Sequence, residues 1–423
     1  MKILWLNAGL LLPLDKGGKL RTWHLMRHLA AHHDITYMCF ADPADPAQHR
    51  AGMREVCREL VTIPRTDPAK GTWRFYADAA GYLLDRTPYA VAKYRSAEYA
   101  ARLSDLLRTR RFDALVCDFL PPVVNLPRDL PCPAVLFTHN VEAEIWRRHA
   151  STAASLPARH LLTAQWQRMR RFERDALSRF DLVLAVSDTD ARTFERQYAG
   201  ALAAPVHVVR TGVDTSYFTP AGGAERPNHL VFTGSMDWLP NEDGMLHFVQ
   251  EILPRMRQGE PRVTLSIVGR APTPAVRRLA ELPGIEVTGR VDDVRPYVAA
   301  SSVYVVPLRI GGGTRLKIFE AMAMQKPVVS TTVGAEGLPV RDGTHLVLAD
   351  DPAAFAEATL QLLRDPARRR QVAADARRLV TEHYDWSAVG HDVEEALARA
   401  CRGLAPRDGR HGAAAGAERS RAS

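Results

Sequence analysis

The segment from Gly311 to Met324 reads GGGTRLKIFEAMAM and follows an apolar run that ends Val305-Val306-Pro307-Leu308. This order predicts a buried strand, a glycine loop and then a helix. Glycines let the backbone turn tightly and approach a ligand, and the first turn of a helix offers unpaired N–H groups to an anion. Arg315 and Lys317 add positive charge, and Glu320 follows in the same helix. The combination suits a ligand with a diphosphate and a sugar-like diol, such as a nucleotide sugar.

The bulk composition bounds the class of protein. The chain has 423 residues, of which 46% are hydrophobic and 25% charged, as in a folded globular protein. That length predicts two domains of roughly 150–200 residues each. No apolar run approaches the ~20 residues needed to span a bilayer, and the N-terminal segment resembles a first buried strand more than a signal peptide. The five cysteines show no paired close spacing, so we expect a cytoplasmic protein without a disulfide framework.

The charge balance suggests the kind of partner. A net charge of +8 fits an anionic substrate or a membrane surface. No nucleic-acid-binding motif is visible, so no nucleic-acid partner is expected. The span from Arg147 to Arg179 is rich in arginine, and two interpretations of it stay open. It is either a peripheral contact with the inner membrane or a basic solvent face on a core helix.

Short apolar runs alternate with longer amphipathic stretches, which predicts parallel sheets covered by helices. A first series of strands is expected at Lys2–Leu6, Ile35–Phe40, Glu59–Ile63, Ala114–Cys117, Ala134–Thr138 and Leu182–Val186. A second series is expected at His207–Arg210, His229–Thr233, Thr264–Val268, Ile285–Thr288, Val303–Val306, Pro327–Ser330 and Leu346–Leu348. The boundary between the two series is placed in Ala199–Pro205. Residues 403–423 are rich in Gly, Ala, Ser and Arg and are expected to form a disordered tail.

Short motifs follow one another in a recognisable order. They are Gly17-Gly18, Thr138-His139-Asn140, Val186-Ser187, Thr211-Gly212-Val213-Asp214, Phe232-Thr233-Gly234-Ser235, Val268-Gly269, Thr288-Gly289-Arg290-Val291 and the block from Gly311 to Ala323. In this order the chain resembles the family-4 glycosyltransferases with the GT-B fold. Its closest resemblance is to the bacterial exopolysaccharide sugar transferases found with exosortase-type systems. The likeness covers nearly the whole folded chain.

The resemblance implies an α/β fold of two Rossmann-like parallel-sheet domains that face across a cleft. Residues 1–204, completed by 384–402, would form the acceptor domain, and residues 205–383 the nucleotide-sugar donor domain. The C-terminal helix, here Trp386–Arg399, would cross back to the first domain. The implied reaction transfers a sugar from a nucleoside-diphosphate donor with retention of configuration, with no cofactor and no bound metal. Asp188-Thr189-Asp190 is expected to begin a helix instead of forming a metal site.

The resemblance also assigns roles in the donor domain. Glu320 stands where the family's ribose-binding carboxylate stands; the alternative is a glutamate that favours the helix dipole. The family has another glutamate earlier in the chain, separated from this one by seven residues. Gly312 occupies that place here. The backbone N–H groups of Gly312, Gly313 and Thr314 would then bind the sugar or the distal phosphate, unless the segment is a plain tight turn.

Basic side chains are expected to meet the diphosphate. Arg315 and Lys317 are candidate phosphate ligands, although a pair of surface charges is the alternative. The family often carries an Arg and a Lys shortly after the strand at His229–Thr233, but the segment from Gly234 to Asn241 has neither. That charge is therefore expected at Arg315 and Lys317, or at Arg270.

The remaining candidates lie after other strands. Gly17 and Gly18 are expected to let the first domain approach the leaving phosphate, or to form an ordinary turn. His139 follows a buried strand and is assigned with Glu320 to the catalytic set, as a group that positions the donor sugar; a structural cap is the alternative. Arg290 and Val291 follow the strand at Ile285–Thr288, where the family's backbone pairs with the donor base. An ordinary strand-to-helix turn would look the same.

Three hypotheses follow. The first is a retaining glycosyltransferase that extends an exopolysaccharide or a lipid-linked glycan. The second is a nucleotide-sugar epimerase or a phosphorylase on the same fold. The third is a non-catalytic nucleotide-sugar-binding protein, suggested by Gly312 and the missing basic pair.

Overall fold

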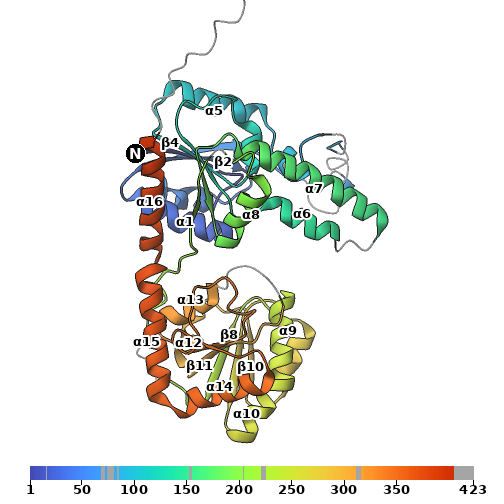
Figure 1. The fold of residues 1–423 in the computed structure, drawn as a ribbon, viewed down its shortest axis with the longest axis vertical. Helices are drawn as coiled ribbons and strands as arrows, with labels where there is room; N and C mark the ends of the chain where they lie inside the picture. Colours follow the sequence, from blue (N-terminus) through green and yellow to red (C-terminus); the bar gives the residue numbers. More distant parts are fainter. Residues whose placement is uncertain are drawn as a thin grey trace, which may run out of the picture. The chain divides into compact units, whose positions relative to one another are not determined.

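The computed structural model describes residues 1–15, 17–67, 72–73, 81–82, 85–151, 155–202, 204–220, 225–310 and 316–403. The chain falls into two compact units (Figure 1). The first comprises Met1–Val209 together with the residues from Asp392 onward, and the second comprises Arg210–His391. The predicted tail after residue 403 lies outside the described residues.

The first unit is built on a parallel sheet. Its described strands are β1 (Lys2–Leu6), β2 (Asp34–Ala41), β3 (Glu59–Pro64), β4 (Ala114–Asp118), β5 (Ala134–Phe137), β6 (Leu182–Ala185) and β7 (Val206–Val208). They pair in the order β3-β2-β1-β4-β5-β6-β7. Strands β4, β5 and β6 are buried along their whole length, as expected when helices cover both faces of a parallel sheet.

The helices of the first unit include a long hairpin. The described helices are α1 (Gly17–Ala30), α2 (Ala47–Gly52), α4 (Tyr89–Ala92), α5 (Ala97–Thr109), α6 (Glu142–Ser151), α7 (Leu156–Leu177) and α8 (Asp188–Tyr198). Figure 1 shows α6 and α7 side by side, extending from the sheet. Fully buried Glu173 of α7 accepts hydrogen bonds from the backbone N–H groups of Glu142 and Ala143, at the start of α6, and from the hydroxyl of Tyr198 in α8. One side chain therefore joins three helices.

The second unit repeats the architecture. Its described strands are β8 (His229–Thr233), β9 (Thr264–Val268), β10 (Ile285–Gly289), β11 (Val303–Val306), β12 (Val328–Ser330) and β13 (Val347–Leu348), paired in the order β10-β9-β8-β11-β12-β13. Its described helices are α9 (Leu239–His247), a π-helical turn at Phe248–Ile252, α10 (Leu253–Gly259), α11 (Pro274–Arg278), α12 (Arg295–Ala300), α13 (Leu316–Ala323), α14 (Pro352–Arg364) and α15 (Pro366–His383). Buried side chains from both faces of the sheet form one core.

The last helix, α16 (Trp386–Gly403), begins in the second unit and ends in the first. Near the middle of α16, Glu394 Oε1 lies 2.8 Å from Nε2 of His33, and Asp392 Oδ2 lies 2.9 Å from Nε2 of His207. The return of the C-terminal helix to the first domain is thus present, as is the predicted α/β architecture of two Rossmann-like domains.

One strand assignment was wrong. The strand expected at His207–Arg210 as the first of the second series is β7, and it pairs with β6 in the first sheet. Its three residues are partly buried, so their composition alone does not indicate which sheet they join. The expected start of a helix at Asp188 is confirmed, with Ser187 as its N-cap.

In both sheets, candidate ligand-binding residues lie near the point where the strand order reverses. In doubly wound sheets, ligands bind beyond the carboxyl ends of the strands where the strand order reverses. This point lies between β1 and β4 in the first unit and between β8 and β11 in the second. Residues that follow these strands therefore occupy the ligand-binding position of each unit.

Candidate functional site

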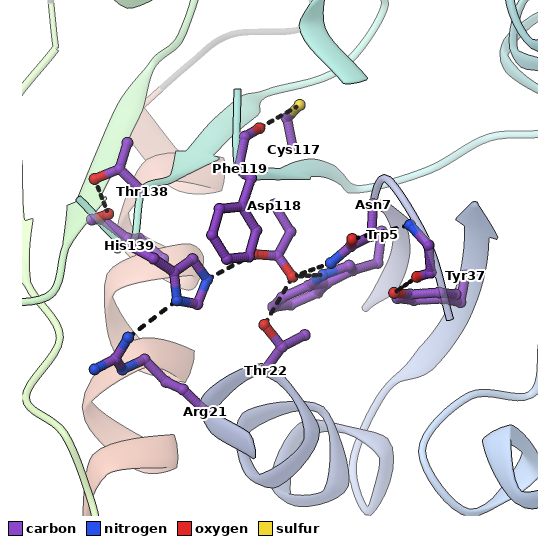
Figure 2. Close-up of polar contacts among 12 residues, drawn as sticks. Trp5, Asn7, Arg21, Thr22, Tyr37, Cys117, Asp118, Phe119, Thr138 and His139 are labelled. Atoms are coloured by element: carbon purple, nitrogen blue, oxygen red, sulfur yellow. Dashed lines mark hydrogen bonds and ion pairs between the residues drawn. The ribbon is translucent and has the colours of Figure 1, made fainter. Parts of the chain in front are cut away.

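A buried carboxylate organises the reversal point of the first sheet. Asp118 ends β4 and is fully buried. Its Oδ2 atom accepts hydrogen bonds from Trp5 Nε1 at 3.1 Å, Asn7 Nδ2 at 2.7 Å and Thr22 Oγ1 at 2.8 Å. Its Oδ1 atom lies 2.8 Å from Nε2 of His139. Figure 2 shows these side chains converging from β1, α1 and the ends of β4 and β5. A buried charge needs such partners, because desolvation penalises it otherwise. We call this set the Asp118 cluster.

His139 is held at both ring nitrogens. Its Nδ1 atom lies 3.0 Å from Nη1 of Arg21, and a guanidinium can only donate. Nδ1 therefore accepts, Nε2 carries the proton, and the ring donates to Asp118. Burial lowers the pKa of His139, with the Asp118 contact opposing that effect. The imidazole is consequently a neutral, fixed group, which suits a positioning role better than proton transfer.

Two further residues fix the plane of this ring. Phe119 stacks on His139 with ring centroids 3.9 Å apart and an interplanar angle of 9° (Figure 2). The Phe119 backbone has a φ of 68°, a left-handed conformation that is unusual for a bulky residue. A Cβ atom on Gly18 would lie 2.8 Å from Cζ of Phe119 and 3.6 Å from Nδ1 of His139. The second residue of α1 must therefore be small for this packing to form.

The structure thus brings together two residues that the sequence singled out separately, Gly18 and His139. Gly17 begins α1, and a Cβ atom there would meet nothing within 4 Å, so it stands beside open space. Asp118 was missed. The only signal in the sequence is an acid directly after the apolar run Ala114–Cys117, and nothing there connects it with a histidine 21 positions away.

Three glycines line the carboxyl edge of the second sheet. Gly234 follows β8, Gly269 follows β9 and Gly289 ends β10. The backbone N–H of Gly234 donates to the carbonyl of Val268 at 2.9 Å, and that of Gly269 to the carbonyl of Gly289 at 3.2 Å. Gly269 has a φ of 154°, and a Cβ atom there would lie 1.7 Å from the carbonyl oxygen of Gly234. The loops after β8 and β9 can approach each other this closely only because glycine stands at position 269.

Lys317 reaches this glycine row from α13. Its Nζ atom donates to Oδ1 of Asn241 at 2.9 Å and lies 4.0 Å from the centre of the Phe232 ring. A Cβ atom on Gly234 would lie 2.7 Å from the same Nζ atom. The predicted donor-site residues Gly234 and Lys317 are therefore in contact, and the ammonium group is fixed at the end of β8.

Arg270 lies at the same edge but is exposed. Its Nε atom donates to Oγ of Ser235 at 2.8 Å, and its carbonyl accepts from the backbone N–H of Met236. The loops after β8 and β9 are joined by these bonds. Arg270 thus lies beside the segment after β8, which itself has no basic residue.

Glu320 lies one turn after Lys317 in α13 and is partly buried. Burial raises the pKa of its carboxyl to about 7, against the lowering effect of Lys317. Among the described residues, no hydrogen bond or ion pair engages this carboxylate. A hydrogen-bond donor from a ligand would favour the ionised form.

Arg290 borders a pocket of about 550 Å³ beside Gly289, which is lined by the loop after β9, the helical segment that follows this loop and the end of β10. Val291 is instead packed against the core of the second unit. The candidates Gly312, Gly313, Thr314 and Arg315 lie outside the described residues, so their roles stay predictions. Across the part of the chain that the structure describes, no cluster of three or more His, Cys, Asp or Glu side chains could hold a metal ion.

Two family models match the chain in succession. The model described as Glycosyltransferase Family 4 matches residues 16–217, and the model described as Glycosyl transferases group 1 matches residues 227–365. The first match lies largely in the first unit and the second match lies within the second unit.

Two curated relatives are about a third identical to this chain over the aligned stretch. The phosphatidyl-myo-inositol mannosyltransferase of Mycobacterium leprae is 34% identical over 219 residues, which is 50% of this chain and 57% of that protein. The D-inositol 3-phosphate glycosyltransferase of Frankia alni is 32% identical over 213 residues, or 44% of this chain and 51% of that protein. The chain thus spans about half the length of the curated relatives it matches.

Solved structures match over nearly the whole chain. The sucrose-phosphate synthase of Thermosynechococcus elongatus has a TM-score of 0.65 at 18% identity, covering 96% of this chain and 100% of that one. Anabaena HepE in complex with UDP has a TM-score of 0.65 at 15% identity, covering 94% and 100%. At such identities the likeness establishes the fold. Given two consecutive family models and two doubly wound units of the kind that these solved structures share, the chain belongs to glycosyltransferase family 4 and has the GT-B fold.

Proposed function

We propose that the protein is a retaining glycosyltransferase that moves a sugar from a nucleoside-diphosphate donor to a growing exopolysaccharide or lipid-linked glycan, without a bound metal. The observation that carries this proposal is the carboxyl edge of the second sheet. There Gly234 and Gly269 are packed too closely for any side chain, and Lys317 is fixed against Gly234. A diphosphate needs both backbone access and a fixed positive charge.

The donor would lie along this edge. Lys317 would contact a phosphate, with Arg315 and the backbone of residues 312–314 as further predicted ligands. Glu320 would accept hydrogen bonds from the ribose hydroxyls, and the pocket beside Arg290 would hold the base. Because solved structures of Anabaena HepE contain UDP and UDP-glucose, UDP-glucose is the first donor to test.

Retention of configuration requires the acceptor oxygen to bond to the anomeric carbon on the face from which the diphosphate departs. The bond between that carbon and the phosphate oxygen breaks, and the departing phosphate oxygen takes the acceptor's proton. His139 would position the donor sugar and would not act as a base, because both of its ring nitrogens are already engaged. Backbone groups near Gly17 and Gly18 would approach the leaving phosphate.

A peripheral contact of a cytoplasmic protein with the inner membrane completes the proposal. Leu156 and Leu161 are 69% and 48% exposed in the first turns of α7, and exposed Arg159 lies between them. Apolar side chains flanked by basic ones suit an anionic bilayer surface. Within the described ranges, none of the helices combines the length and apolarity needed to cross a membrane.

The test is an assay of donor turnover. The purified protein is incubated with a panel of nucleotide sugars, and release of nucleoside diphosphate is followed with and without a membrane lipid extract. Release that depends on the extract and survives EDTA supports the proposal. Loss of activity with EDTA overturns the metal-free step, interconversion of donor sugars indicates an epimerase, and tight donor binding without turnover indicates a binding protein.

A further inference from the structure

A second pocket lies entirely within the first unit, lined by residues of α6, α7 and α8 and of the turn before α6. Figure 1 shows where these three helices lie. Its volume is about 620 Å³. Arginines come from all three helices: Arg147 and Arg148 from α6, Arg170 from α7 and Arg196 from α8. Neither the glycine row nor the Asp118 cluster includes any of these side chains.

The charges around this pocket do not balance. Its acidic lining residues are Glu144 and Asp190. Glu144 is already engaged, because its Oε2 lies 2.8 Å from Nε of Arg147 and its Oε1 accepts from Nε2 of Gln197 at 2.6 Å. Within the described part of the chain, no hydrogen bond or ion pair engages the guanidinium groups of Arg170 and Arg196. The pocket therefore carries an excess of positive charge, and the N–H groups of Arg170 and Arg196 can donate to a ligand.

The rest of the lining is apolar and aromatic. Val141, Ile145 and Trp166 line the same pocket, and Trp166 also packs against the core of the first unit. A partly exposed aromatic ring offers a face on which a sugar ring can stack. Arginines beside such a face differ from an ordinary solvated basic surface, which has no concave apolar wall.

The pocket adjoins the Asp118 cluster through two links. Asn140 lines the pocket and directly follows His139. Asp190, which also lines the pocket, interacts electrostatically with both Arg148 and Arg21, and Arg21 is the hydrogen-bond partner of His139. A molecule in this pocket would therefore lie next to the residue proposed to position the donor sugar.

We propose that this pocket binds an anionic group, a phosphate or a carboxylate, carried by the acceptor. The inference rests on the proposed transferase function and specifies the acceptor as a negatively charged glycan or lipid-linked sugar. Guanidinium groups bind such oxyanions through paired, charge-assisted hydrogen bonds, and Arg170 and Arg196 supply them from two helices. Trp166 would contact the adjoining sugar ring.

Equilibrium binding without any donor tests the pocket independently of turnover. Three soluble probes are titrated into the full chain: farnesyl diphosphate, a glucuronic-acid-containing tetrasaccharide and neutral maltotetraose. The test variant is Arg170→Ala with Arg196→Ala. Its matched control is Arg171→Ala with Arg192→Ala, which removes the same charge from exposed positions of the same two helices outside the pocket.

At least one anionic probe should bind the unchanged protein and lose roughly tenfold or more in affinity in the test variant, but not in the control. Farnesyl diphosphate as the stronger probe would assign a phosphate-bearing acceptor, and the tetrasaccharide a carboxylate-bearing one. Equal weakening in both variants, equal binding of maltotetraose, or no binding of either anion would overturn the inference. A protein that binds an anion here but releases no nucleoside diphosphate would refute the transferase function alone.

Discussion

The Nε2 atom of His139 lies 2.8 Å from Oδ1 of Asp118, and this contact fixes which nitrogen of the imidazole carries the proton. Arg21 donates to the opposite nitrogen, so the chain of donors runs from Arg21 through the ring to the carboxylate. Neither residue is free to change its hydrogen-bond role alone. The orientation of the His139 ring is therefore fixed by Asp118, which lies at the end of a neighbouring strand.

Asp118→Asn should break this chain. The amide nitrogen would face either Nε2–H of His139 or the three donors on the other side, so one donor would oppose another. An unsatisfied buried group costs roughly 1–3 kcal/mol, and we expect a loss of unfolding free energy of that size. Turnover should fall by roughly 10-fold or more through displacement of His139, while donor affinity changes little. Steady-state kinetics and calorimetric titration of the donor give these two quantities.

Thr22→Val is the matched control for that change. It removes one donor to Oδ2 of Asp118 but leaves the contact with His139 intact. We expect a stability loss of roughly 1 kcal/mol and turnover within about twofold of the original protein. Equal turnover in both variants would show that the orientation of His139 does not matter.

Donor affinity should depend on the ionisation of Glu320. Burial raises the pKa of this carboxyl to about 7, so it is mostly protonated at about pH 6 and mostly ionised at about pH 8. If ribose hydroxyls donate to it, the ionised form binds better, and affinity should rise about tenfold across that range. Calorimetric titration with UDP-glucose at several pH values measures the slope.

Glu320→Gln should flatten this pH profile, because the amide cannot ionise. Any slope that remains would belong to the nucleotide or to other groups. Parallel profiles for the two proteins would exclude Glu320 from the ribose contact.

The fold could be predicted because parallel strands buried on both faces leave continuous apolar runs in the sequence. Strands such as Lys2–Leu6 and His229–Thr233 match their predicted limits. The failures lie where burial is weaker. The strand β7 has three partly buried residues, and its assignment depends on pairing with β6. The helix α15 is mainly polar and rich in arginine, and no apolar period predicted it.

The candidate site divides in the same way. Gly234 and Lys317 were predicted from separate motifs, and the structure brings them into contact. Contacts between residues far apart in the chain were not predicted from the sequence: Asp118 and His139 are 21 positions apart, and their partner Arg21 is 118 positions from His139. The sequence contains these residues, but only the order of the strands places them together.

The glycine row gives a comparison of steric clash with backbone strain. Gly269→Ala should place Cβ against the carbonyl oxygen of Gly234 and destabilise the second unit by roughly 3 kcal/mol or more. Gly289→Ala meets no atom within 4 Å and has only its φ of 69° to strain, at a cost of roughly 1 kcal/mol. Urea unfolding measures the stability loss in each variant, and a separate donor titration of the folded protein measures donor binding. If the two variants are equally stable, the close approach of the loops after β8 and β9 is not rigid.

The buried carboxylate of Glu173 should make the first unit less stable as pH rises. Burial raises its pKa to about 7, with the Tyr198 hydrogen bond opposing the shift. An acid whose pKa is raised by folding favours the folded state at low pH, and this contribution is lost as pH rises from about 4.5 to about 7. Glu173→Gln stays neutral throughout, so its stability relative to the original protein should increase by roughly 3 kcal/mol across that range.

Burial also raises the pKa of nearby Glu142, but that group is present in both proteins and its contribution to the difference largely cancels. Thermal unfolding midpoints at several pH values, with exposed Glu195→Gln on α8 as the control, measure the difference. A pH-independent gap between Glu173→Gln and the original protein would mean that folding leaves the pKa of Glu173 near its ordinary value of 4.5, so that the carboxylate is ionised at neutral pH. In that case its bonds to α6 and α8 would be strong enough to offset burial, and the three helices around the arginine pocket would be joined by a charged group.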